Sequence, residues 1–276
     1  MGLRINQNVE AMNAYRHLTE TQNSLSNSLE KLSSGFRINR AADDAAGLSI
    51  SEKLRAQIGG FQQSMQNAQD GISMLQTGEG ALNETTAILQ RVRDLAVQAA
   101  NGTQDTESRT AANNEVTASL AEIDRISTAT KYGSTSLLST NGSFTFQVGN
   151  SSAATDQISV TVTAMNTASG GLNLSGLSIG TAASAQAALA SIDYAISTVS
   201  AQRSSFGAAQ NRLQHTVANL GVAVENLSAS ESRIRDVDMA SEMVNFTKSQ
   251  ILSQAGTAML AQANQAPQSV LSLLHG

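Results

Sequence analysis

The apolar residues of this chain recur with helical spacing over most of its length. The a and d positions of a coiled coil follow one another at steps of three and four residues. Within residues 3–33, Ile5, Val9 and Met12 follow one another at steps of four and three, and Leu18, Leu25, Leu29 and Leu32 at steps of seven, four and three. Gly35 follows directly, and glycine is common just after a helix end. The pattern predicts a helix over residues 3–33.

The longest pattern predicts a helix that begins near Asp43 or Asp44. Acidic residues are favoured at helix N-termini. It ends near the sequence Asn-Gly-Thr at residues 101–103. Steps of four and three, and later of seven, connect its apolar positions: Leu54, Ile58, Phe61, Met65, Ala68, Ile72, Leu75, Leu82, Leu89 and Ala96. A helix of about 57 residues would span roughly 85 Å. A helix of this length needs partners along most of its surface.

Three further segments show helical periodicity. Residues 105–130 carry an apolar stripe at Val116, Leu120, Ile123 and Ile126. Residues 183–230 contain a stripe at Leu213, Val217, Leu220, Val224 and Leu227. Residues 238–274 contain Met243, Val244, Ile251, Leu252, Ala255, Met259 and Leu260. Helices therefore occupy both ends of the chain.

The middle of the chain has a different composition. Residues 133–181 are rich in Gly, Ser, Thr and Asn, and two short runs alternate apolar and polar residues. The alternating apolar positions are Phe144, Phe146 and Val148, and then Ile158, Val160 and Val162. This period of two predicts a β-hairpin at about residues 143–163. The expected fold is mainly α, a long antiparallel helical bundle or coiled coil with one small β-hairpin in the middle.

Composition narrows the possible functions. The 276 residues include no Cys, no Trp and one Pro, and the formal net charge is −5. The lack of cysteine excludes thiolate catalysis and Cys-based zinc sites. A mildly acidic chain without a basic block gives little support to nucleic-acid binding. No apolar run approaches the roughly 18 residues typical of a membrane span, and the N-terminus does not have the pattern of a Sec-type signal peptide.

One charged cluster could be a catalytic or metal-binding site. It consists of Arg37, Arg40, Asp43 and Asp44. Adjacent carboxylates could bind a metal, but at a helix start they are more often caps or ion-pair partners. The three histidines lie far apart in sequence, and no HExxH, G-x-S-x-G or P-loop motif occurs. We therefore expect no catalytic, cofactor or metal site. Residues 31–60 are positively charged overall and residues 225–242 negatively charged, so an ion-pair network between them is expected if the chain ends lie side by side.

Several long motifs resemble those of bacterial flagellins. They include "SSGFRINRAADDAAGLSISEKLRAQIGG", "LQRVRDLAVQAANGT", "ENLSASESRIRDVDMASEM" and "QAGTAMLAQANQAPQSVLSLL". The resemblance covers almost the whole chain in order and implies a short form without variable outer domains. It implies a structural subunit, not an enzyme, that self-assembles into the extracellular flagellar filament after type III export. The implied organisation is an inner coiled coil from residues 1–33 and 238–276, connecting spokes at 34–43 and 231–237, and an outer bundle over 44–230.

The resemblance also suggests roles for particular residues. It makes the charged cluster at Arg37, Arg40, Asp43 and Asp44 part of a spoke that sets subunit geometry. It implies contact with a host innate receptor through Arg91, Leu95 and Glu115. The C-terminal apolar residues form an assembly patch: Val270, Leu271, Leu273 and Leu274. The implied partners are further copies of the chain, hook-associated junction and cap proteins, an export chaperone and host receptors, with neither nucleic acid nor membrane.

Three alternatives stay open at this point. A hook–filament junction protein shares flagellin-like termini, although the complete C-terminal match and the short middle argue against it. A few flagellins carry peptidase inserts, but this chain has neither an insert nor a zinc motif. A coiled-coil adaptor or tail-sheath component would share the helical pattern without forming a long filament.

Overall fold

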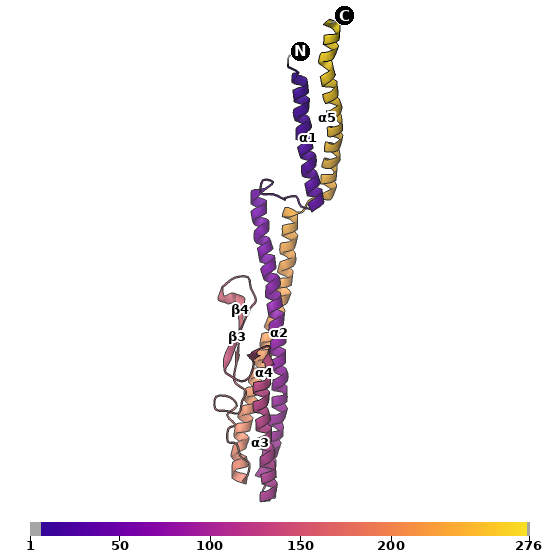
Figure 1. Ribbon diagram of the computed structural model, residues 1–276. Coiled ribbons are helices and arrows are strands. Elements are labelled where there is room, and N and C mark those ends of the chain that lie inside the picture. The colour runs from indigo at the N-terminus through magenta and orange to yellow at the C-terminus, as the bar shows by residue number, and fades with distance from the viewer. Residues whose placement is uncertain (1–6, 275–276) are drawn as a thin grey trace. The chain divides into compact units, whose positions relative to one another are not determined.

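The computed structural model describes the backbone of residues 7–274 and the side chains of residues 7–265 (Figure 1). The helices are α1 (Val9–Ser34), α2 (Ala45–Ala100), α3 (Thr106–Ala129), α4 (Ala182–Arg235) and α5 (Met239–Leu274). The strands are β1 (Lys131–Tyr132), β2 (Thr135–Ser136), β3 (Gly142–Gln147) and β4 (Gln157–Val162). The mainly α fold with a central hairpin is thus confirmed.

The chain divides into two compact units. The terminal unit contains the residues up to Ala56 and those from Asn226 onward, and the central unit contains Gln57–Glu225. The division falls within α2 and α4, so the first turns of α2 and the last turns of α4 belong with the terminal helices. The sequence-based division placed these boundaries at residues 44 and 230 instead.

Helix α1 starts later than its apolar pattern predicted. The Asn8 side chain accepts a hydrogen bond of 3.0 Å from the Ala11 N–H and so caps the helix. Residues 7 and 8 are therefore outside the helix, although the pattern placed its start at residue 3. The other end agrees with the prediction, because Gly35 adopts a left-handed conformation with φ 75° and its N–H donates to the Lys31 carbonyl.

Helices α1 and α5 run side by side and antiparallel within the terminal unit (Figure 1). At one end, Asn8 Nδ2 donates to the Ala263 carbonyl at 2.7 Å. At the other end, Phe36 and Asp236 form an antiparallel β-bridge. The two chain ends therefore fold back on each other, as the helical pattern predicted.

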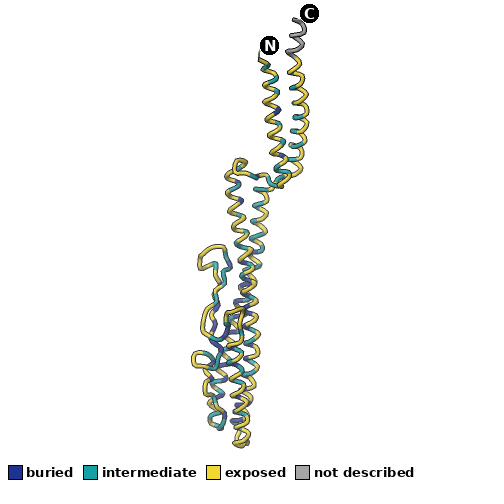
Figure 2. Tube along the Cα trace, viewed as in Figure 1, coloured by how far each residue is buried: buried dark blue, intermediate teal, exposed yellow. Residues whose placement is uncertain are grey.

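In the central unit, the heptad positions of α2 form the core. Ala68, Leu75, Leu82, Leu89 and Ala96 are all buried, as their spacing predicted. Pairs of contacts show that α2 packs antiparallel to both neighbours. Arg93 Nε donates to Asp193 and Gln210 Nε2 of α4 donates to Glu79, while Arg109 Nε of α3 donates to the Ala99 carbonyl and Arg91 Nε donates to Glu115. Figure 2 shows the buried residues gathered where α2, α3 and α4 pack together.

Two glycines allow aromatic rings to approach α2 closely. A Cβ atom on Gly71 would lie 2.9 Å from the Phe146 ring of β3, and one on Gly78 would lie 2.9 Å from the Phe206 ring of α4. These glycines are seven residues apart and therefore lie on the same helix face. The packing explains why a long helix retains residues that weaken it.

The central β-hairpin lies where the alternation predicted it, and the structure gives its register. Strands β3 and β4 pair antiparallel, with Phe144 opposite Val160 and Phe146 opposite Ile158. The buried Gln202 side chain of α4 accepts from the Thr163 N–H and donates to the Thr161 carbonyl, which ties the end of β4 to the helix. A second, two-residue hairpin of β1 and β2 was not predicted, since runs so short carry no alternation.

Helix α4 continues past the predicted end at residue 230. It runs to Arg235, and only residues 236–238 separate it from α5. The backbone of the segment assigned to a spoke at 231–237 is therefore largely helical. No proline or glycine interrupts this stretch, so the helix can continue until Asp236 forms its bridge with Phe36.

Candidate assembly surfaces

The charged turn between α1 and α2 is organised by its own backbone. The Asp43 carboxylate accepts hydrogen bonds from the N–H groups of Arg40 at 2.9 Å and Asn39 at 3.1 Å. These donors, first that of Arg40, hold the pKa of Asp43 below its usual value. Asp44 Oδ1 accepts from the Gly47 N–H at 2.8 Å and so caps α2. Both aspartates thus fix the turn and the helix start.

The two arginines of this turn point to different partners. Arg40 makes a bidentate pair with Glu30 of α1, at 3.0 and 2.9 Å. Arg37 reaches the other segment, where its guanidinium donates to the Ile234 carbonyl at 2.6 Å and its N–H donates to the Arg235 carbonyl at 2.7 Å. Of the four residues singled out in the sequence, Arg37 alone is seen to bond to the returning chain, and it binds carbonyls rather than carboxylates.

The ion pairs that connect the two segments use other residues. Arg235 Nη1 lies 2.9 Å from Glu52 Oε1, and Arg55 Nη2 lies 3.6 Å from Glu231 Oε1. The Arg235 guanidinium also lies 4.9 Å from the centroid of the Phe36 ring. The expected opposite charges of the two segments therefore do meet. The sequence contained these residues, but no local signal distinguished them from other surface charges.

The seam between α1 and α5 combines small residues with a few large apolar ones. The least exposed positions of both helices recur at steps of three and four, as in a coiled coil. In α1 they are Ala11, Ala14, Leu18, Thr21, Leu25, Ser28 and Leu32, and in α5 Glu242, Phe246, Ser249, Ser253, Gly256, Leu260 and Ala263. A Cβ on Gly256 would lie 3.2 Å from Leu18, so the helices approach closely there. Leu29, which the pattern placed on the seam, is 53% exposed.

Most large apolar residues of these helices lie outside the seam, and some of them, such as Leu252 and Met259, lie at its edge. We call them the outer apolar face: Val9, Met12, Tyr15, Leu29, Met239, Met243, Val244, Ile251, Leu252 and Met259, all exposed. Figure 2 accordingly shows α1 and α5 with almost no buried residue. Shallow hollows on this surface include one of about 510 Å³ on α5, lined by Met243, Val244, Ile251 and Leu252 among others. Within the terminal unit, these helices leave unburied the side chains that cores normally contain.

The C-terminal patch can be placed only in part. The backbone of α5 is helical through Leu274. The side chains of Val270, Leu271, Leu273 and Leu274 lie outside the part of the chain whose side chains the structure describes. The predicted patch therefore stays a prediction.

The three residues predicted to contact a receptor do not share one surface. Arg91 Nε of α2 donates to Glu115 Oε1 of α3 at 2.8 Å, and both side chains are exposed. Leu95 is only 4% exposed and belongs to the core of the central unit. In this state of the chain, the Arg91–Glu115 pair can be reached from solvent and Leu95 cannot.

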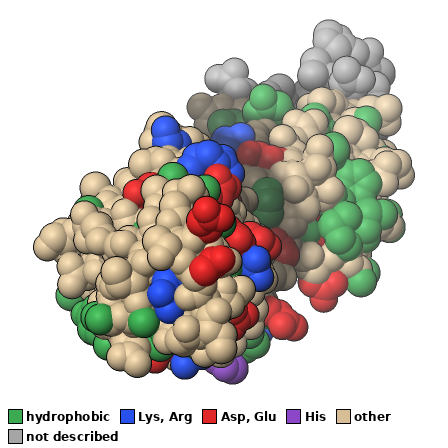
Figure 3. Space-filling model, turned by 90° about the horizontal axis from the view of Figure 1, so that it is seen from below, with side chains coloured by type: hydrophobic (Ala, Val, Ile, Leu, Met, Phe, Trp, Pro, Cys, Tyr) green, Lys and Arg blue, Asp and Glu red, His purple; other side chains and the backbone are tan. Residues whose placement is uncertain are grey.

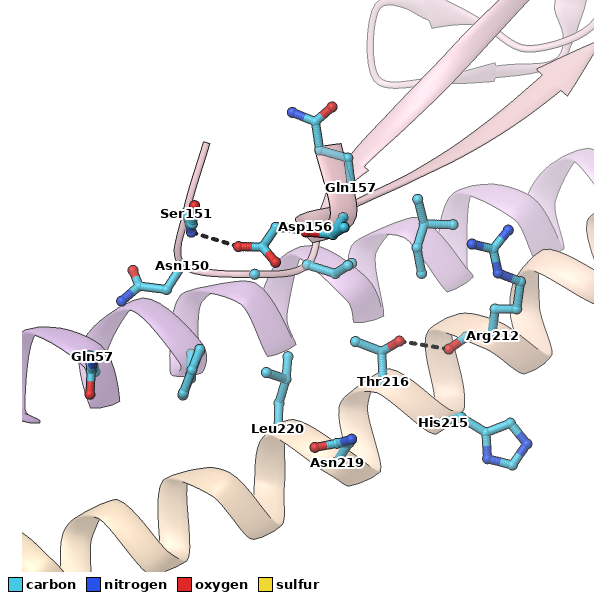
Figure 4. A pocket seen from close by; sticks show the side chains of 15 residues that line it. Gln57, Asn150, Ser151, Asp156, Gln157, Arg212, His215, Thr216, Asn219 and Leu220 are labelled. Carbon is cyan, nitrogen blue, oxygen red and sulfur yellow. Dashed lines mark hydrogen bonds between the residues drawn. The ribbon is translucent and has the colours of Figure 1, made fainter. Parts of the chain in front are cut away.

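A hollow of about 760 Å³ lies in the central unit between α2, the loop before β4 and α4 (Figure 4). Asp156 accepts from the Ser151 N–H there, and the His215 ring points away from the loop.

The described residues contain no group of three or more His, Cys, Asp or Glu side chains suited to a metal. The face shown in Figure 3 interleaves acidic and basic side chains among uncharged polar ones. Among the described helices, none combines the length and apolar character needed to cross a membrane.

Comparison with known proteins is consistent with this architecture. The family model for the bacterial flagellin N-terminal helical region matches residues 5–143, and that for the C-terminal helical region matches residues 189–274. Flagellin of Halalkalibacterium halodurans is 50% identical over 98% of this chain and 99% of its own length. Flagellin of Bacillus subtilis is 47% identical over 99% of this chain and 100% of its own.

A solved Vibrio parahaemolyticus structure, provisionally assigned as a flagellar hook-associated protein, has a TM-score of 0.60. It covers 70% of this chain and 100% of its own at 16% identity, which is a likeness of fold alone. The relatives matched along their whole length are flagellins, so the junction-protein alternative gains no support. The chain belongs to the bacterial flagellin family, and it is a structural subunit of the flagellar filament rather than an enzyme.

Proposed function

We propose that the subunit polymerises through the outer apolar face of α1 and α5, which together form the inner layer of the filament. The observation that carries this proposal is that most large apolar side chains of the terminal helices are in solvent, while the seam between the helices covers only a few, among them Leu18, Leu25 and Phe246. Fully burying one large aliphatic side chain contributes about 1.5–3 kcal/mol. Residues that are half exposed in the single chain retain about half of that contribution for association with further copies.

Two charge substitutions on adjacent residues of α5 test the proposal. Ile251 belongs to the outer apolar face, whereas Gln250 is an exposed polar neighbour. Ile251→Lys should abolish filament formation, because a lysine would have to be buried between subunits. Gln250→Lys should preserve it. Sedimentation and electron microscopy report assembly, and circular dichroism reports the helical content of the monomer. Normal filaments from Ile251→Lys would refute the proposal.

The turn between α1 and α2 is proposed to act as the spoke between the inner layer and the outer bundle. Support comes from its dense hydrogen bonding, in which Asp43 fixes the turn and Arg37 anchors it to the last turn of α4. Asp43→Lys would remove both backbone hydrogen bonds and should impair polymerisation or alter filament shape, with the central unit still folded. Asp43→Asn keeps one acceptor oxygen and should be milder. Unchanged motile filaments from Asp43→Lys would contradict this role.

The C-terminal residues Val270, Leu271, Leu273 and Leu274 are proposed to stay unprotected, or bound by the export chaperone, until assembly buries them. Chain ends usually fray unless a partner covers them. Amides of residues 268–276 should exchange rapidly in the monomer and slowly in the filament. Truncation after Gln268 should prevent assembly, and normal polymerisation of that variant would argue against the patch.

Host receptor recognition is proposed to use the exposed Arg91–Glu115 pair, with Leu95 supporting it from the core. Arg91→Ala should reduce receptor signalling by monomeric protein without changing its helical content. Arg93→Ala is a matched control on the same helix, since Arg93 forms a similar exposed pair with Asp193. Equal signalling by wild type and Arg91→Ala would remove this proposal.

The remaining partners are proposed from the resemblance to flagellins and from the exposed outer apolar face. Hook-associated junction and cap proteins would meet the two ends of the polymer, where the outer apolar face lacks a neighbouring copy. Export through a type III channel to the cell exterior suits a subunit whose terminal helices gain their packing only on assembly. Co-sedimentation of purified cap protein with filament ends tests the first of these. A cap protein that binds filament sides and ends equally would argue against it.

A further inference from the structure

The methionines of this chain are divided by exposure between the two units. Among those whose side chains are described, Met12, Met239, Met243 and Met259 of the terminal unit are 48–64% exposed. In the central unit, Met74 is 9% exposed, Met165 is fully buried and Met65 is half-buried. The flexible, polarisable methionine side chain suits interfaces that form by adaptation. Its thioether sulfur is also the one readily oxidised group in a chain without cysteine.

Three of the exposed methionines line hollows on α1 and α5. Met12 lies beside Tyr15 and Leu260, and Met243 lies beside Val244 and Ile251. Met259 lines a hollow of about 640 Å³ between the two helices, together with Leu18 and Ala255. A second copy that filled these hollows would place the sulfur atoms against apolar side chains.

We propose that these methionines form an oxidation site of the free subunit, through which peroxides block polymerisation. The proposal rests on the proposed role of the outer apolar face in assembly. The site consists of Met12, Met239, Met243 and Met259, and its substrate class is a two-electron oxidant such as hydrogen peroxide. Assembly would remove the same sulfur atoms from solvent, so the filament would resist an oxidant that inactivates the monomer.

The chemistry needs no group beyond the peroxide. A lone pair of the thioether sulfur attacks one peroxide oxygen, the S–O bond forms and the O–O bond breaks. The second oxygen leaves as water after proton transfer from the transferred oxygen. Sulfur loses two electrons and the peroxide gains them, which yields methionine sulfoxide and water.

The sulfoxide would disturb the interface because it is a strong hydrogen-bond acceptor. Of the side chains that line the hollow beside Met243, Val244, Ile251 and Leu252 are aliphatic and cannot donate to it, whereas Thr247 already donates to the Met243 carbonyl and Lys248 is a charged donor. Burial would take the new oxygen out of water and place it against a partly aliphatic surface, which is unfavourable. Oxidation would therefore weaken the association of subunits. It would leave the folding of the central unit unchanged, because the buried methionines of that unit react slowly.

Peroxide treatment of monomer followed by peptide mass spectrometry tests the order of oxidation. We expect the four exposed methionines to oxidise at least about tenfold faster than Met74 and Met165. The treated monomer should need at least about a tenfold higher concentration to form filaments, since taking one sulfoxide oxygen out of water at the interface is enough for that change. Methionine sulfoxide reductases should restore assembly without any substitution in the chain.

A matched pair of variants assigns the effect to the site. In the variant with leucine at all four exposed positions, peroxide should leave the concentration needed for assembly unchanged relative to the same variant without peroxide, because leucine has no oxidisable sulfur. The control Met74→Leu/Met165→Leu should remain as sensitive as wild type. Normal polymerisation of monomer that is fully oxidised at the four positions, or peroxide sensitivity of the fourfold leucine variant, would overturn the inference.

The same measurement on intact filaments separates this inference from the proposed function. If the four methionines oxidise as fast in filaments as in monomer, the outer apolar face is not buried and the proposed function fails along with the site. If they are protected in filaments and oxidised monomer still polymerises normally, the site alone fails. Protection together with blocked assembly supports both.

Discussion

Substituting Gly78 of α2 by alanine should reverse the usual effect of a glycine-to-alanine change in a helix. Inside a helix, this change ordinarily stabilises by about 1 kcal/mol. At Gly78, however, the new methyl group would lie 2.9 Å from Cε2 of Phe206. That ring is only 2% exposed and cannot move aside freely. Inserting a methyl group into a packed core typically costs about 1–3 kcal/mol, so the net change should be a loss of about 0–2 kcal/mol.

Gly80 provides the matched control. It lies two residues further along the same helix, and a Cβ atom there would meet nothing within 4 Å. Gly80→Ala should therefore gain about 1 kcal/mol from helix propensity alone. The two variants should differ by about 1–3 kcal/mol in the free energy of unfolding, although their sequence changes are identical in kind.

Urea denaturation of the monomer, followed by circular dichroism, measures this difference. Amide exchange of residues 199–213 in α4 gives a local readout at the Phe206 contact. The double variant Gly78→Ala/Phe206→Leu should be more stable than the sum of its single changes predicts, because the smaller side chain makes room for the methyl group. Equal stabilisation by Gly78→Ala and Gly80→Ala would refute the packing argument.

Three further predictions concern polar contacts. The folded-state pKa of Asp43 lies below its unfolded value of about 3.9, so its stabilisation of the turn is present above that pH and is lost as pH falls through the folded pKa. The amide of Arg40 should therefore exchange faster, relative to its intrinsic rate, below about pH 4. Protection of this amide that does not change with pH would contradict the prediction. Gln202→Met should destabilise the central unit by about 1–3 kcal/mol in urea denaturation, since the Thr163 N–H and the Thr161 carbonyl lose their partner. An unchanged free energy of unfolding would mean that water replaces the Gln202 side chain as that partner. Arg235→Lys keeps the charge but loses the planar stacking on the Phe36 ring. The amides in the last turn of α4 should therefore exchange faster, and unchanged protection of these amides would argue against the ring contact.

The elements of this protein follow from local patterns in its sequence. The heptad of α2 placed its core residues correctly, from Ala68 to Ala96, because side chains at steps of three and four share one helix face. The alternation around Phe144 likewise predicted the hairpin, since strand side chains alternate between faces. The motifs were long enough to indicate the family. Each of these inferences uses residues that are close together in the chain.

The tertiary structure decided which apolar residues of the terminal helices find a partner. Each terminal helix carries apolar residues on more than one face, and spacing alone could not show that Leu18 lies on the seam while Leu29 lies in solvent. Heptad periodicity identifies a set of residues that share a face but not the surface that covers them. Which face is covered depends on how closely the helices approach, and Gly256 of α5 allows a close approach beside Leu18.

The polar contacts of the charged turn between α1 and α2 were also decided by tertiary structure. The sequence showed a cluster of charges at residues 37–44 but could not assign Arg40 to Glu30 or Arg235 to Glu52. Likewise, Leu95 and Arg91 are neighbours on one helix, yet one is in the core and the other pairs with α3. An ion pair depends on the separation of two side chains in space. Arg235 and Glu52 are 183 residues apart in the chain, so only the folding back of α4 along α2 brings them together.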